Sequence, residues 1–149
     1  MNFPRIFRAF VALGIATFAF AAPAVAGVSA GGGLFASGGN GSSSSGAAVL
    51  ISSGRAVPVL PAELDITGFA PLARGGGYAV TLEGRFGMAG NAIGAGYGIG
   101  QFGGSGSGGT FTAFLDHGIA PFTSLELRGY QTTGSNSATA GFLGVRFSF

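Results

Sequence analysis

Few side chains in this chain could carry out chemistry. His117 is the only histidine, and the chain has no cysteine. A histidine that acts as a catalytic base needs a nucleophile such as serine beside it, and no His-x-Ser-Asn-like segment accompanies His117, which directly precedes a predicted turn at 118–121. We therefore expect no catalytic residue. One histidine among scattered carboxylates also predicts no metal site.

Glycine-rich segments twice match the G-x-G-x-x-G spacing of dinucleotide-binding loops. The matches are Gly98, Gly100 and Gly103, followed by Gly104, Gly106 and Gly109. Such a loop binds phosphate because the N-terminus of a helix follows the glycines. No helical pattern follows either match, and chance matches are expected in a chain with 31 glycines. We expect no cofactor.

The charged residues follow the period of a strand. After residue 26, eight of the ten charged residues share one alternating face, namely Glu63, Asp65, Glu83, Arg85, Asp116, Glu126, Arg128 and Arg146. Residues two apart on a strand, such as Glu83 and Arg85, point to the same side. This spacing favours structural ion pairs over acid–base catalysis. The other two, Arg55 and Arg74, fall in predicted connections.

The elements that must position these charges are strands. Apolar residues alternate with small or polar ones from Gly27 onward, without a helical stripe, and glycine- and serine-rich breaks separate the runs. Each run is close to the ~9–11 residues that a tilted strand needs to cross a bilayer. The predicted strands span residues 27–37, 46–54, 58–69, 76–87, 91–102, 109–119, 122–133 and 138–149.

The connections between these strands fall into two alternating classes, as they do in a membrane-spanning barrel with longer loops on one side and short turns on the other. The first class comprises 40–45, 70–75, 103–108 and 134–137, and the second comprises 55–57, 88–90 and 118–121. Within the first, Ser42–Ser45 is predicted to be a solvated loop. If the last hairpin is centred on 134–137, Glu126 and Arg146 lie roughly opposite each other, and we hypothesise an ion pair between them.

Two folds could use strands with one apolar and one charged face. In a soluble sandwich or lipocalin-like barrel the charged face meets water, and in a membrane barrel it lines the lumen. Charged residues make up 8% of this chain, against about 25% in soluble domains, and all seven basic residues are arginine. The composition favours an all-β, eight-stranded antiparallel up-and-down transmembrane β-barrel. Because residues 27–149 are near neutral, we expect no nucleic-acid partner.

Residues 1–26 have the organisation of a signal peptide. Arg5 and Arg8 form a basic start, an apolar run covers 9–22, and Ala24 and Ala26 match the small residues of a cleavage site. The alternative is a transmembrane anchor helix, for which the apolar run is short against the ~20 residues required. We expect two parts, a signal peptide over 1–26 and the barrel over 27–149.

The end of the chain resembles a known family. The segment 142–149, Phe-Leu-Gly-Val-Arg-Phe-Ser-Phe, and the segment 124–130, Ser-Leu-Glu-Leu-Arg-Gly-Tyr, are similar to the last two strands of the small eight-stranded outer-membrane β-barrels. That family is typified by the transmembrane domain of outer membrane protein A and by outer membrane protein X. The resemblance implies residence in the outer membrane of a Gram-negative bacterium, contact with its lipid, and recognition of Val145, Phe147 and Phe149 by the barrel-assembly machinery.

Three functions remain open from the residues. The first is a non-enzymatic barrel with a structural or surface-interaction role. The second is a narrow, porin-like channel, since Gly94, Gly96, Gly98 and Gly100 share the lumen face of the fifth strand and leave room there for water, for Phe114 or Phe142, or for arginine side chains. The third is an outer-membrane enzyme that modifies lipid A, which the position of His117 disfavours. The sequence leaves the oligomeric state open.

Overall fold

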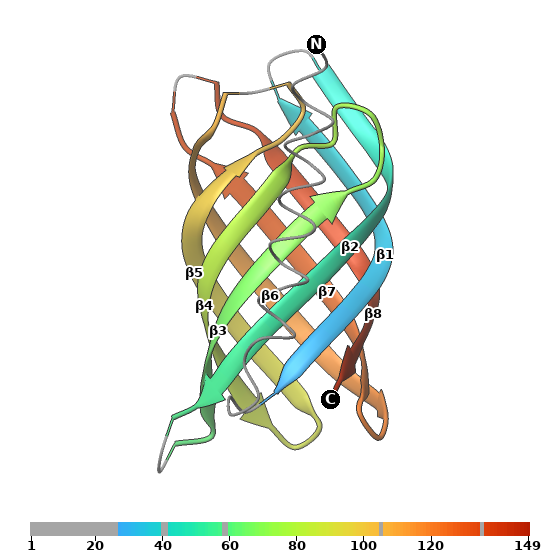
Figure 1. Ribbon diagram of the computed structural model, residues 1–149, viewed down its shortest axis with the longest axis vertical. Coiled ribbons are helices and arrows are strands. Elements are labelled where there is room, and N and C mark those ends of the chain that lie inside the picture. Colours follow the sequence, from blue (N-terminus) through green and yellow to red (C-terminus); the bar gives the residue numbers. More distant parts are fainter. Residues whose placement is uncertain (1–26, 40–41, 58–59, 105, 135) are drawn as a thin grey trace.

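The computed structural model describes residues 27–39, 42–57, 60–104, 106–134 and 136–149. These residues form eight strands that close into a single barrel (Figure 1). The strands are β1 (Val28–Gly39), β2 (Ser42–Ala56), β3 (Ala62–Pro71), β4 (Tyr78–Met88), β5 (Asn91–Gln101), β6 (Gly108–Ala120), β7 (Thr123–Thr132) and β8 (Thr139–Ser148). The predicted all-β, up-and-down barrel is confirmed.

Closure depends on the pairing of the first and last strands. Each strand is antiparallel to its neighbours in sequence, and β1 pairs with β8 from Ser29 opposite Ser148 to Gly38 opposite Thr139. The ring therefore leaves no open sheet edge, which satisfies the backbone without help from water.

Within the described ranges, no helix is long enough and apolar enough to cross a membrane.

Six of the eight strands begin and end within two residues of their predicted bounds. The second strand differs, because Ser42–Ser45 is not a solvated loop but part of β2, paired with 36–39 of β1. The partner strand supplies the backbone hydrogen bonds that these serines would otherwise take from water. The third strand begins at Ala62 and not at residue 58, after Pro61, which has no N–H to donate to a ladder; residues 58 and 59 lie outside the described residues.

The connections lie at two ends of the barrel. We call one of them the inner end. It holds Val28, the first residue of β1, Ser148, the last residue of β8, and the connections 57–61, 89–90 and 121–122. Both residues of the 89–90 turn have positive φ, 42° at Ala89 and 82° at Gly90, as a two-residue hairpin turn requires. The connections 72–77, 102–107 and 133–138 lie at the outer end. Arg74 lies in one of them as predicted, whereas Arg55 is exposed near the end of β2 and not in a connection.

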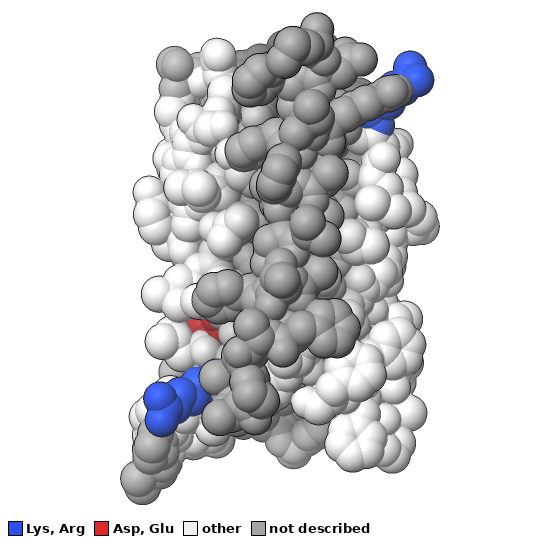
Figure 2. Space-filling model, in the orientation of Figure 1, with Lys and Arg blue, Asp and Glu red and all other residues white. Residues whose placement is uncertain are grey.

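The outward face of the wall is apolar. Large side chains on alternating positions of every strand are exposed, among them Leu34, Ile66, Leu82, Ile99, Phe111, Leu127 and Leu143. Figure 2 shows one side of the barrel, on which basic side chains project only near the two ends. The described charged side chains that are buried all point into the lumen.

The lumen face of β5 consists of glycines because neighbouring groups occupy the space of a side chain. A Cβ atom at Gly98 would lie 1.9 Å from the carbonyl oxygen of Val80, and one at Gly96 would lie 2.4 Å from that of Leu82. By contrast, a Cβ atom at the outward-facing Gly129 would meet no atom within 4 Å.

We predict that Gly98→Ala destabilises the barrel by about 1–3 kcal/mol, the usual cost of overpacking, because a backbone oxygen must move. Gly129→Ala is the matched control and should fold like the parent protein. The folded fraction can be followed by heat-dependent gel mobility across a urea series. Equal urea midpoints for the two variants would contradict the close packing of β5.

Candidate functional site

The lumen is the candidate site, because the chain's buried charges and buried aromatic rings gather there. Two layers fill it. The inner layer, nearer the termini of the barrel, is an ion-pair network formed by Asp65, Glu83, Arg85, Asp116, Glu126, Arg128 and Arg146. The outer layer, nearer the longer connections, is an aromatic cluster formed by Phe35, Phe69, Phe102, Tyr130 and Phe142.

Arg128 holds the centre of the ion-pair network. Its Nε donates to Glu126 Oε1 at 2.5 Å, and its Nη1 donates to Glu83 Oε1. All three side chains are fully buried, with 0% of their surface exposed. Glu83 also accepts hydrogen bonds from the hydroxyl groups of Thr67, at 2.9 Å, and Thr81. Charged groups removed from water in this way must be paired to be tolerated.

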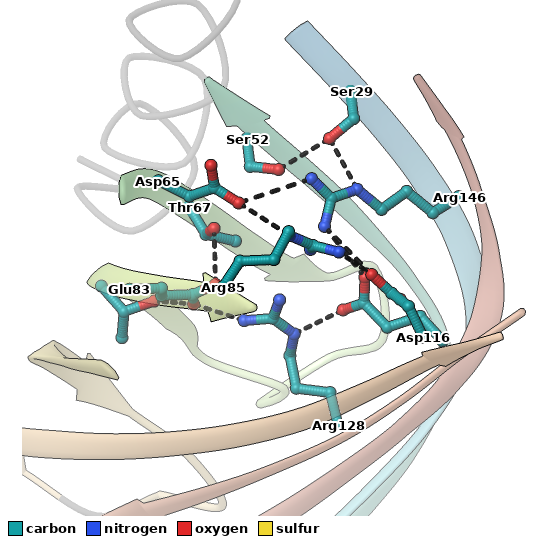
Figure 3. Close-up of polar contacts among 11 residues, drawn as sticks. Ser29, Ser52, Asp65, Thr67, Glu83, Arg85, Asp116, Arg128 and Arg146 are labelled. Atoms are coloured by element: carbon teal, nitrogen blue, oxygen red, sulfur yellow. Dashed lines mark hydrogen bonds and ion pairs between the residues drawn. The ribbon is translucent and has the colours of Figure 1, made fainter. Parts of the chain in front are cut away.

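Arg85 and Arg146 connect the remaining acids (Figure 3). Arg85 Nε lies 3.1 Å from Asp65 Oδ2, and Arg85 Nη1 contacts Asp116 Oδ2. Arg146 reaches three carboxylates from β8: Asp65 at 3.6 Å, Asp116 at 3.6 Å and Glu126 at 3.5 Å. These contacts join β3, β4, β6, β7 and β8 across the lumen.

Arg146 is oriented by hydroxyl groups from β1, the strand that pairs with β8, and from β2 beyond it. Its Nε donates to Ser29 Oγ at 2.7 Å, and Ser29 Oγ lies 2.7 Å from Ser52 Oγ. The network thereby extends into β1 and β2, which contribute no charge to the lumen.

Phe114 contacts two of the arginines. The guanidinium carbons of Arg85 and Arg128 lie 4.6 Å and 4.4 Å from its ring centroid, within cation–π range. The ring packs over Gly94, where a Cβ atom would lie 2.2 Å from Phe114 Cζ. The glycine face of β5 accommodates Phe114, as the sequence suggested, whereas Phe142 packs over Gly144.

The aromatic cluster closes the outer half of the lumen. Phe69 stands at its centre, and its ring centroid lies 4.8 Å from that of Tyr130, 5.5 Å from Phe142, 6.1 Å from Phe102 and 6.4 Å from Phe35. Phe69 was not among the predicted lumen residues. Strict alternation from Asp65 and Thr67 would have placed it there.

Of the eight charged residues predicted to line the lumen, the structure buries seven in the network. The exception is Glu63, which is exposed at the inner end of β3 and has no ion-pair partner among the described residues. Glu63 has the same alternating position on β3 as Asp65. It lies at the inner end of the barrel, however, where its side chain remains in contact with solvent.

The hypothesised pair of Glu126 and Arg146 makes contact. Glu126 lies opposite Gly144, and Arg146 lies opposite Ser124. The two residues are therefore diagonal neighbours on adjacent strands, and their closest charged atoms are 3.5 Å apart.

The other singled-out residues lie outside the lumen. His117 is exposed on the outward face of β6, with its Nδ1 2.8 Å from Asn91 Oδ1. Among the residues with described positions, no group of three or more histidines and carboxylates could hold a metal ion. Phe147 and Phe149 are exposed and Val145 is half-buried on the outward face of β8, and their recognition during assembly stays a prediction. Ala24 and Ala26 lie outside the described residues.

Solved structures with the same architecture exist. The barrel superposes on Neisserial surface protein A with a TM-score of 0.55 and 15% identity, over 83% of this chain and 96% of that one. The attachment invasion locus protein Ail of Yersinia pestis gives 0.53 and 15%, over 85% and 100%. The N-terminal β-barrel domain of Pseudomonas aeruginosa OprF gives 0.50 and 17%, over 84% and 98%.

The chain has the fold of the small eight-stranded outer-membrane β-barrels. No family model and no curated protein sequence matches it. At 15–17% identity, the similarity to small outer-membrane barrels establishes the fold alone. What this barrel does must therefore be argued from its own wall and lumen.

We predict that Arg128→Met destabilises the barrel by about 3–5 kcal/mol, because it leaves Glu83 and Glu126 buried without their closest cation. Arg74→Met is the matched control, since Arg74 is exposed in the connection between β3 and β4, and such surface changes stay within about 0.5 kcal/mol. The measurement is the urea midpoint of the heat-modifiable band. Indistinguishable midpoints for the two variants would show that the network does not stabilise the fold.

Proposed function

We propose that the protein is a non-enzymatic outer-membrane barrel of a Gram-negative bacterium, with a closed lumen and a structural or surface-interaction role. Residues 1–26 would direct its export and be cleaved after Ala26. The observation that carries this proposal is the filled interior: an aromatic cluster and an ion-pair network lie one above the other in the same narrow lumen.

The wall supports residence in a membrane. Its outward face is apolar between the two ends, and every strand is paired on both sides, so the backbone of the paired strands does not need water. Aromatic side chains project at the inner rim, where outer-membrane barrels carry an interfacial girdle. These are Phe86, Phe122, Phe147 and Phe149. The proposed partners are membrane lipid along the wall and the assembly machinery at β8.

The lumen supports a structural role over conduction. Eight strands enclose an interior just wide enough for side chains to fill, and here Phe69, Arg128 and Phe114 occupy it. A solute would have to displace stacked rings and break buried ion pairs. The porin-like alternative would require the glycine face of β5 to leave a path, but Phe114 covers that face at Gly94.

The position of His117 supports a non-enzymatic role. It lies on the lipid-facing side of β6 near the inner rim, and its ring contacts the Asn91 amide. A lipid A-modifying enzyme would need such a base beside a nucleophile at the outer leaflet, at the other end of the barrel.

We predict that Leu82→Arg and Met88→Arg differ in their effect on stability. Both side chains are exposed on the outward face of β4, at 52% and 58%, but Leu82 lies near the middle of the strand and Met88 at its inner end. In a bilayer the first change should cost about 2–4 kcal/mol and the second about 0–1 kcal/mol. Urea midpoints in lipid vesicles measure both costs. In a soluble barrel both arginines would meet water, so equal tolerance would refute membrane residence.

We also predict that the protein inserted in a planar bilayer carries no steady single-channel current, because rings and ion pairs close the lumen. Insertion is checked independently by the heat-dependent gel mobility of the protein recovered from vesicles of the same lipid. A steady, reproducible conductance from folded protein would favour the channel instead.

A further inference from the structure

The ion-pair network is unbalanced in charge. Four carboxylates, Asp65, Glu83, Asp116 and Glu126, face three guanidinium groups, those of Arg85, Arg128 and Arg146. The remaining acid of the chain, Glu63, is exposed and does not join them. If all seven groups were ionised, the buried network would carry one uncompensated negative charge, which is costly in a medium of low dielectric constant.

Two pairs of buried carboxylates face each other across neighbouring strands, Asp65 with Glu83 and Asp116 with Glu126. The contacts of each carboxylate assign the excess charge to the second pair. Asp116 of β6 and Glu126 of β7 are direct cross-strand partners, and both side chains point into the lumen and are buried. Directly opposed side chains of an antiparallel pair have Cβ atoms about 4.5–5.5 Å apart. Two ionised carboxylates in one buried site repel each other, which disfavours ionisation of both.

The other two acids are well supplied with donors. Glu83 accepts from Arg128, Thr67 and Thr81, and Asp65 lies between Arg85 and Arg146, at 3.1 Å and 3.6 Å. Neither residue has an oxygen among the described buried atoms that lack a hydrogen-bond partner. Asp116 and Glu126 differ in this respect, and we therefore assign the imbalance to that pair.

Each member of that pair has one oxygen without a hydrogen-bond partner. Asp116 Oδ1 and Glu126 Oε2 are buried and accept no hydrogen bond within the described part of the chain. Arg146 Nη1 lies between the two carboxylates, 3.6 Å from Asp116 Oδ2 and 3.5 Å from Glu126 Oε2, and it too makes no hydrogen bond there. One guanidinium nitrogen thus serves two carboxylates at distances too long for a hydrogen bond with either.

The neighbouring elements supply no further cation. From β4 and β7, Arg85 and Arg128 already pair with Asp116 and Glu126 through their other oxygens. From β5, Ala92 lies opposite Asp116, and from β1 the nearest polar group is the Ser29 hydroxyl that orients Arg146. Tyr130, the other titratable group in the lumen, stacks on Arg128 with a ring-to-guanidinium distance of 5.7 Å.

We propose that Asp116 and Glu126 form a proton-binding pair, which holds one proton between them at neutral pH and thereby brings the buried network to zero net charge. The proton belongs to the pair and not to one residue, as in other coupled carboxylates. The inference rests on the lumen of the barrel and does not depend on where the barrel resides or whether it conducts.

The direct test is infrared spectroscopy of the folded protein in detergent micelles. A protonated carboxyl group has a C=O stretch that is separate from carboxylate bands and shifts in deuterium oxide. We expect this band in the parent protein at neutral pH. It should be retained in Glu63→Gln, the matched control at an exposed acid, and lost in Asp116→Asn and in Glu126→Gln, where three carboxylates balance three arginines.

The second test is the pH dependence of unfolding. The unfolded chain ionises its carboxyl groups near pH ~4, so above that pH the folded state carries one proton more than the unfolded state. Unfolding then releases a proton, and the unfolding equilibrium constant should rise about tenfold per pH unit between about pH 6 and pH 8. Stability falls as pH rises. Glu63→Gln should keep this dependence and Asp116→Asn should remove it.

The infrared measurement on the parent protein tests whether the network holds a proton, even if a variant fails to fold. A missing acid band at neutral pH would overturn the proposal. If an alkali-metal cation supplied the missing charge, the band would be absent and the urea midpoint would change between sodium, potassium and a bulky organic cation at equal ionic strength. An acid band that survives in both Asp116→Asn and Glu126→Gln would overturn the assignment to this pair.

Discussion

A closed ring of eight strands must fill its own interior with side chains. Closure removes every free sheet edge and directs alternate residues inward. Every second side chain of each strand therefore has to fit into the lumen. In this protein the inward half contains seven of the ten charged residues that the structure describes, and the outward half is apolar. The arrangement reverses that of a soluble barrel and makes the buried ion pairs a condition of the fold.

The division of the lumen into two layers follows from this constraint. Three arginines and four acids occupy the inner half, where Ser29 and Ser52 add hydrogen bonds and Arg85 and Arg146 retain slight contact with solvent. Rings centred on Phe69 occupy the outer half. The rings close one end of the barrel and keep the network in a medium of low dielectric constant, which strengthens each pair and makes any imbalance expensive.

The glycines of β5 leave space in the lumen for the side chains of the inner layer. Since β5 contributes no side chain beyond Ala92 to the inner layer, Phe114 can lie over Gly94 and contact two guanidinium groups. A barrel with ordinary side chains on β5 would have to move Phe114 or an arginine outward. The packing of Phe114 and the position of the arginines beside it therefore both depend on the glycines of β5.

The sequence by itself determined the strands, their alternating faces and the chemical contrast between wall and lumen, because the period of two is a local property that each strand carries. This period placed Asp65, Glu83, Asp116 and Arg128 on the lumen face of their strands. Only the tertiary structure decided the partners, since register depends on how hairpins close: Glu126 meets Arg146 diagonally, and Ser42–Ser45 extends β2. It alone set Asp116 opposite Glu126, because two residues on different strands become neighbours only when the ring is formed.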